Sequence, residues 1–119
     1  MAKHSLDHAA VRIADLERSR QFYEGLLGFS PVPRPDFGFP GMWYGLGAGQ
    51  LHLIQREPAT SGGLDPTDPH FAIEVEDLPA LRQRLVAAGL EILEFGGTQM
   101  WVRDPDGYTV ELRQAGAPR

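Results

Sequence analysis

The sequence of 119 residues contains no cysteine. This absence excludes disulfides, thiolate nucleophiles and cysteine-ligated metals, and it fits a cytoplasmic protein. No apolar run approaches the roughly 20 residues of a membrane-spanning helix, so no membrane association is expected. Positive charge is scarce, because 11 basic residues face 16 acidic ones and the net charge is −5. This balance speaks against a nucleic-acid partner.

Apolar and turn-forming residues are plentiful instead. The chain is 42% hydrophobic, with 14 glycines and 10 prolines. A chain of this length buries roughly two-thirds of its unfolded surface, which is enough for one core. We therefore expect one domain over residues 1–119 with many turns.

One stretch of the chain occurs twice. HAAVRIADL at 8–16 and HFAIEVEDL at 70–78 both begin with histidine, alternate apolar residues and end in Asp-Leu. The Met-Trp pair at 42–43 recurs at 100–101. A repeat of this kind predicts two modules, since one copy cannot bury both its helix and its sheet.

Each module reads as β-α-β-β-β, which gives an α+β fold. Alternation predicts the strands, Asp15 and Asp77 cap the helices, and Gly28 and Gly89 end them. Prolines 31, 33 and 35 predict an edge or irregular strand. The modules span about 5–56 and 70–113, with a Gly- and Pro-rich linker at about 57–69. The predicted strands are 5–13, 29–34, 41–46, 50–55, 70–75, 90–95, 98–104 and 108–114, with a turn at 104–107.

Four candidate metal ligands fall on one side of these strands. Because side chains alternate, the large apolar residues face the helices. A curved mixed sheet with its helices outside would wrap its other face around a cavity. Three imidazoles and a carboxylate suit Zn²⁺, Ni²⁺, Co²⁺, Mn²⁺ or Fe²⁺. A single histidine on a strand is more often structural, but here three of the chain's four share this face: His8, His52 and His70, with Glu111.

The segments DLERSRQFYEGLLGF (15–29) and VRDPDGYTVEL (102–112) resemble the vicinal oxygen chelate superfamily. This superfamily includes glyoxalase I, fosfomycin-resistance transferases, bleomycin-resistance binders, methylmalonyl-CoA epimerase and extradiol dioxygenases. The resemblance runs from His8 to Leu112. It implies that His8, His52, His70 and Glu111 hold a divalent ion, which chelates two neighbouring oxygens of a small-molecule substrate.

The resemblance is greatest to glyoxalase-I-like proteins, and it implies a metal-dependent lyase or isomerase acting on a small α-oxygenated or thiol-conjugated compound. Glu111 would then move a proton as well as bind the ion. Arg12 matches an arginine that holds a glutathione carboxylate, although an ion pair with Glu74 is an alternative role. Two departures bear on the substrate: His52 replaces a usual glutamate, and Arg56 replaces a glutathione-site asparagine.

Other members of the superfamily imply other functions. A fosfomycin-type thiol transferase would carry a threonine at Ala10. An extradiol dioxygenase is disfavoured, because Trp101 replaces its tyrosine and 93–97 contains no histidine. A non-catalytic antibiotic or small-molecule binder would use the aromatic segment 35–45. A flat ligand would stack on Phe37, Phe39, Trp43 and Trp101, unless the two tryptophans are matched core residues.

Small two-module relatives build their sites across a dimer interface. The resemblance therefore predicts a homodimer in which His8 and His52 of one chain meet His70 and Glu111 of the other. The linker is long enough to allow this exchange. The alternative is a site completed within one chain.

Overall fold

The computed structural model describes residues 6–57, 64, 66, 70–94 and 96–117. The chain divides into two compact units, Met1–Ala59 and Thr60–Arg119, and each contains one of the predicted modules. Most of the predicted linker at 57–69 lies outside the described residues. Among the described helices, none has the length and apolar character needed to cross a membrane.

Module one folds into a four-stranded mixed sheet with the strand order β1-β4-β3-β2. Strand β1 pairs in parallel with β4, and the other two pairings are antiparallel. Strand β2 is short and lies at the edge, as its prolines predict. The elements are β1 (His8–Ile13), α1 (Leu16–Arg20), η1 (Gln21–Leu26), β2 (Ser30–Val32), β3 (Gly41–Leu46) and β4 (Gly49–Gln55).

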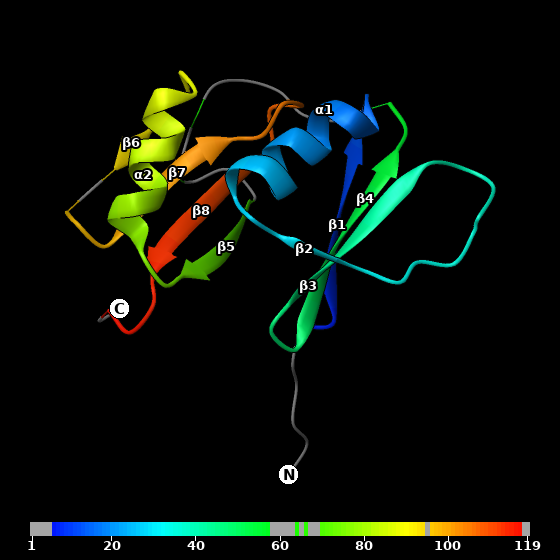
Figure 1. The fold of residues 1–119 in the computed structure, drawn as a ribbon, viewed down its shortest axis with the longest axis horizontal. Coiled ribbons are helices and arrows are strands. Elements are labelled where there is room, and N and C mark those ends of the chain that lie inside the picture. Colours follow the sequence, from blue (N-terminus) through cyan, green and yellow to red (C-terminus); the bar gives the residue numbers. More distant parts are fainter. Residues whose placement is uncertain (1–5, 58–63, 65, 67–69, 95, 118–119) are drawn as a thin grey trace, which may run out of the picture. The chain divides into compact units, whose positions relative to one another are not determined.

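Module two repeats this arrangement with the strand order β5-β8-β7-β6. Strand β5 is parallel to β8, and helix α2 lies beside β8 (Figure 1). The elements are β5 (His70–Val75), α2 (Leu78–Ala87), β6 (Leu93–Glu94), β7 (Gln99–Arg103) and β8 (Thr109–Gln114). The two βαβββ modules confirm the predicted α+β class.

Several elements differ from the sequence prediction. Of the strand predicted at 90–95, residues Leu93–Glu94 form β6, and residue 95 lies outside the described part of the chain. The strand predicted at 29–34 is shorter, at Ser30–Val32. The first helix changes from α to π geometry after Arg20, and Leu27 N–H donates to the carbonyl of Phe22, five residues back. The adjacent side chains of Phe22 and Tyr23 in this segment are both buried. Helical periodicity in the sequence does not distinguish these two geometries.

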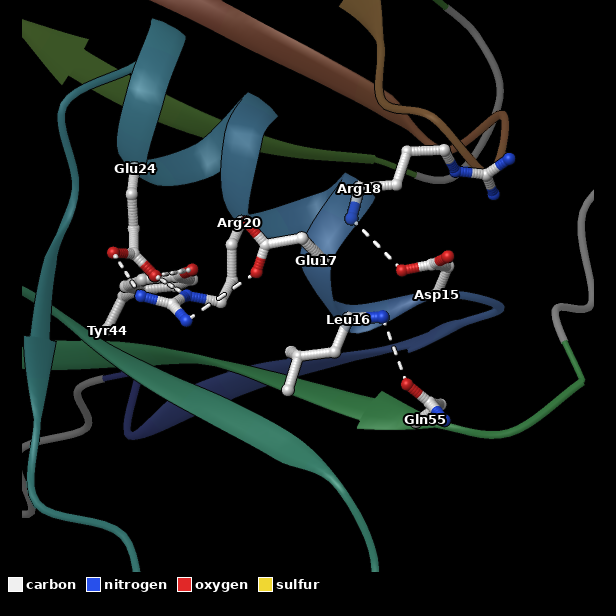
Figure 2. A network of polar contacts seen from close by, with 8 residues as sticks. All are labelled: Asp15, Leu16, Glu17, Arg18, Arg20, Glu24, Tyr44 and Gln55. Atoms are coloured by element: carbon white, nitrogen blue, oxygen red, sulfur yellow. Dashed lines mark hydrogen bonds and ion pairs between the residues drawn. The ribbon is translucent and has the colours of Figure 1, made fainter.

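Both helices begin in the same way, which shows the repeat at the level of single hydrogen bonds. Asp15 accepts from Arg18 N–H, and Asp77 accepts from Ala80 N–H. The last strand of each module adds a second cap, because Gln55 Oε1 accepts from Leu16 N–H at 3.0 Å (Figure 2). Its counterpart Gln114 accepts from Leu78 N–H at 2.9 Å. Each helix start is therefore fixed to its own sheet.

The apolar core of module one lies between its helices and one face of its sheet. Tyr44 of β3 contacts Tyr23 of η1 and Phe29, with ring centroids 6.1 and 5.9 Å away. Ile13 and Leu53 on this face are fully buried. The strand residues between them point to the opposite face, which carries the histidines.

A polar network joins the first helix to β3 in Figure 2. Glu24 accepts from Arg20 Nε at 2.7 Å and from the hydroxyl of Tyr44 at 2.8 Å. The hydrogen bond from Arg20 lowers the pKa of Glu24, and the bond from Tyr44 acts in the same direction against the effect of burial. Burial, with the Glu24 hydrogen bond, raises the pKa of Tyr44 well above its ordinary value. The buried hydroxyl thus stays protonated and donates to a carboxylate.

Candidate functional site

A stack of three rings lies on the histidine face of module one. Trp43 is opposite His52 in the β3–β4 register, and their rings are nearly parallel with centroids 4.0 Å apart. The imidazole of His8 also stacks with that of His52, at 4.2 Å and an interplanar angle of 15°. His52 therefore lies in contact with both its neighbours and is only 9% exposed.

Hydrogen bonds hold the two imidazoles differently. His52 Nε2 donates to Gln50 Oε1 at 2.8 Å, from the same strand. His8 Nδ1 donates to Asp7 Oδ2 at 2.7 Å, but the side chain of Asp7 is 94% exposed. Burial lowers the pKa of His52, and charge on His8 acts in the same direction. The neutral imidazole, which is the form that binds metals, is thus favoured at His52.

Module two places a hydrogen-bonded histidine and glutamate at the corresponding positions. His70 Nε2 lies 3.0 Å from Glu111 Oε1, and it must donate because an ionised carboxylate only accepts. Arg113 Nη1 lies 3.4 Å from the other carboxylate oxygen and donates to Gln99. Glu111 is thereby held between a histidine and an arginine, with its side chain 12% exposed.

The two tryptophans lie in matched positions but differ in exposure. Trp101 is opposite Glu111 in the β7–β8 register, as Trp43 is opposite His52. Trp101 is buried, whereas Trp43 is half-buried. Of the two indoles, that of Trp43 has more surface open to a ligand.

The four candidate metal ligands form two pairs, one in each module. Among the described residues, no group of three or more histidine or acidic side chains is close enough to hold an ion. The pair in module two fits a metal well: ligands about 2.1 Å from an ion and at right angles are about 3 Å apart, as His70 Nε2 and Glu111 Oε1 are. Binding would remove the proton from Nε2.

The pair in module one, His8 and His52, consists of suitable metal ligands, but their rings are oriented differently. A nitrogen lone pair lies in the plane of its ring, so two ligand rings need planes that meet at the ion. The stacked planes of His8 and His52 do not. His8 is the more exposed of the two rings, with 44% of its side chain exposed, and its hydrogen-bond partner Asp7 is itself exposed, whereas His52 is held by Trp43 and Gln50. A rotation of the His8 ring would therefore be needed for the two imidazoles to bind one borderline divalent ion.

Aromatic side chains of the segment between β2 and β3 continue the stack. Phe37 lies 6.0 Å from Trp43 and 5.9 Å from Phe39, measured between ring centroids, and is 50% exposed. Arg34 and Arg56 place their guanidiniums on the Phe39 ring at 5.2 and 4.9 Å. The predicted substrate residues Phe37, Phe39, Trp43 and Arg56 are thus brought together in module one. Arg12 is exposed on the histidine face of β1.

Sequence reasoning missed four residues of this arrangement. Asp7 and Gln50 precede His8 and His52 closely in sequence, and Arg113 follows Glu111 by two. Strand alternation puts Gln50 and Arg113 on the ligand face, so this signal was present in the sequence. Arg34 stands between two prolines in an irregular segment, where periodicity assigns no face.

Comparisons with known proteins agree with this architecture. The family model of the Glyoxalase/Bleomycin resistance protein/Dioxygenase superfamily matches residues 5–112. Glyoxylase I 4 of Arabidopsis thaliana is 31% identical over 91% of this chain and 69% of its own length. The trypanothione-dependent glyoxalase I of Leishmania major is 30% identical, with a TM-score of 0.70 over 94% of this chain and 87% of that one. The fosfomycin resistance protein FosX of Mesorhizobium loti, 19% identical, shares the fold with a TM-score of 0.74 over 96% and 94% of the two chains.

Proposed function

The chain belongs to the Glyoxalase/Bleomycin resistance protein/Dioxygenase superfamily, and from this premise we propose that it is a divalent-metal-dependent lyase or isomerase of glyoxalase type. Its substrate is a small α-oxygenated or thiol-conjugated compound. The ion is Zn²⁺, Ni²⁺, Co²⁺, Mn²⁺ or Fe²⁺, held by His8, His52, His70 and Glu111.

One observation carries this proposal. In each module, a candidate metal ligand on the first strand contacts a second one on the parallel neighbouring strand: His8 contacts His52, and His70 contacts Glu111. Three imidazoles and one carboxylate are the ligands that a borderline divalent ion prefers. The glyoxalase I relatives at about 30% identity support the assignment of reaction class.

When bound, the ion would supply Lewis-acid stabilisation of charge that develops on two neighbouring substrate oxygens. Glu111 removes a proton from a substrate carbon bonded to one of these oxygens and returns it to the neighbouring carbon, which gives the isomer, as base and then acid. Arg113 orients the second carboxylate oxygen of Glu111 through its hydrogen bond to Oε2. The substrate's organic part lies against Phe37, Phe39 and Trp43, and Arg12, Arg56 and Trp101 complete its contacts.

The complete site needs both donor pairs, and we propose that a homodimer supplies them. His8 and His52 of one chain then meet His70 and Glu111 of the partner. This arrangement gives two equivalent sites per dimer.

Metal content tests the proposal. Protein purified without chelator or added metal should carry about one divalent ion per chain, and Glu111→Gln should carry none while keeping its circular dichroism. Glu76→Gln is the matched control, because Glu76 is an exposed carboxylate of the same module. Isomerisation of a hemithioacetal should require both the ion and Glu111. Equal metal content in wild type and Glu111→Gln would overturn the proposal.

A metal-independent binding protein is the second candidate, favoured by the half-exposed ring of Phe37 beside Trp43. Such a protein would bind a flat ligand equally well with and without chelator, and would turn over no α-oxygenated substrate. A Trp43→Ala variant would then lose binding while Glu111→Gln kept it.

A further inference from the structure

Two guanidiniums share one phenyl ring in module one. Arg34 Cζ lies 5.2 Å from the centroid of Phe39, and Arg56 Cζ lies 4.9 Å from it. Arg34 is also 5.0 Å from the Phe37 ring. All three distances are within the roughly 6 Å over which a cation is attracted to an aromatic face. Two positive charges are therefore gathered beside one ring.

Arg34 is fixed in its position by the backbone around it. Its Nη2 donates to the carbonyl of Phe39 at 3.1 Å. A Cβ on Gly41 would come within 2.8 Å of Nη2 and 2.5 Å of the carbonyl oxygen of Leu53. Glycine at this position therefore makes room for the guanidinium against the sheet. Both the charge and the direction of its donors are set before a ligand arrives.

These two charges have no counterion within the described residues. Neither Arg34 nor Arg56 forms an ion pair there, unlike Arg20 and Arg82, which are paired with glutamates. Asp36, two residues from Arg34, accepts instead from Gly38 N–H at 2.9 Å. Like charges without a counterion repel one another, so an anion bound within reach of both guanidiniums would be stabilised by both.

The position of this pair relates it to the histidine face. Gly41, on which Arg34 rests, is paired with Ile54, and Ile54 is paired with Arg12 across β4. This row of residues is next to the one formed by Trp43 and His52. An anion held by Arg34 would lie on the side of module one that carries His52, with the exposed ring of Phe37 available to its apolar part.

We propose that Arg34 and Arg56, held on Phe39, form a binding site for an anionic group of the substrate, a phosphate or carboxylate attached to a flat apolar part. Guanidinium forks match the paired oxygens of both groups. The inference rests on the proposed function only in naming the ligand as the substrate. The binding site itself is assigned from the geometry.

The test measures anion binding by calorimetry in excess chelator, so that it does not depend on the metal. The probes are phenyl phosphate, benzoate, neutral benzamide and inorganic phosphate. Wild type should bind phenyl phosphate or benzoate, and the preferred one identifies the anionic group. Arg34→Gln and Arg56→Gln should each weaken this binding at least tenfold. Arg84→Gln, which removes an exposed charge from α2, should leave it unchanged.

Three results would overturn the inference. Both arginine variants could bind the aromatic anions as wild type does. Neutral benzamide could bind as tightly as the preferred aromatic anion. Inorganic phosphate could also bind as tightly as that anion, which would assign the site to the free ion. Arg56 is exposed, so its variant remains informative even if Arg34→Gln unfolds. Failure of metal binding would leave these measurements unaffected, so the two proposals fail separately.

Discussion

His70 and Glu111 stand in the same register relation as His8 and His52. His70 is paired with Thr109, two residues before Glu111, and His8 is paired with Gln50, two residues before His52. The repeat is thus maintained in the strand register. In each module the two candidate metal ligands lie at matching positions of the parallel strand pair.

Complementation should show whether the site is shared between chains. A His8→Ala chain and a Glu111→Ala chain each lack one ligand of every site. In a mixed dimer with exchanged modules, one site loses both ligands and the other is intact. Metal binding should therefore return to about one ion per mixed dimer. Absence of recovery despite proven subunit exchange, or a monomer in sedimentation at micromolar concentration, would contradict the shared site.

Trp43 should affect metal affinity without touching the ion. Its indole stacks on His52 at 4.0 Å and so limits the rotation of that ring. Trp43→Ala should weaken Zn²⁺ binding by about tenfold, a magnitude typical of groups that orient ligands. Trp43→Phe, which keeps a stacking ring, should restore most of it. Calorimetric titration with Zn²⁺ measures both, and equal losses in the two variants would argue against stacking as the cause.

The strand-to-helix caps should contribute to stability in both modules. Gln55→Ala removes one hydrogen bond to a helix start, at a cost of about 1 kcal/mol in the free energy of unfolding. Gln114→Ala should cost more, because Gln114 also donates to the carbonyl of Glu76 at 2.7 Å. Urea denaturation measures this difference. Gln83→Ala on the exposed face of α2 should change stability by less than about 0.5 kcal/mol, and a loss equal to that of Gln55→Ala would refute the capping role.

Glu24 should make stability depend on pH. Its hydrogen bonds lower its pKa in the folded protein, so its contribution is present above the unfolded pKa and is lost as the pH falls through the folded one. Glu24→Gln should therefore destabilise the protein at pH 7 by about 1 kcal/mol. The difference should shrink towards pH 3. Thermal melts of both proteins over this range check the sign, and a difference independent of pH would show that folding does not lower the pKa of Glu24.

Much of the fold could be predicted from the sequence because its signals are local. Alternation in 8–13 and 70–75 identifies the first strands, and Asp15 and Asp77 mark the helix starts. The π geometry after Arg20 could not be predicted, because the same apolar spacing serves both helix types. The brevity of β6 depends on strand pairing, which the sequence does not reveal.

The sequence could predict which sheet face carries each candidate site residue, but not which of these side chains are in contact. Period-two alternation places His52 and Glu111 each on the face of its own sheet that the large apolar residues do not occupy. Ring orientation depends on neighbours in other strands, so the stacking of His8 on His52 could not be predicted from the sequence. The role of Arg34 depends on the space that Gly41 leaves beside it. Arg34 lies in the loop between β2 and β3, so hydrophobic periodicity could not indicate this contact.

The confinement of strand pairing to each module bears on how the chain folds. The most distant partners in the ladders, such as His8 and Gln50, are roughly 40 residues apart, and no described ladder crosses the linker. Chain closure is therefore divided into two steps of similar length, and its entropic cost grows only slowly with the length of each loop. Extra residues at the junction would leave both steps unchanged. Each half carries the complete pairing information for its own sheet, so the nascent first half has its strand partners available before the second half is synthesised.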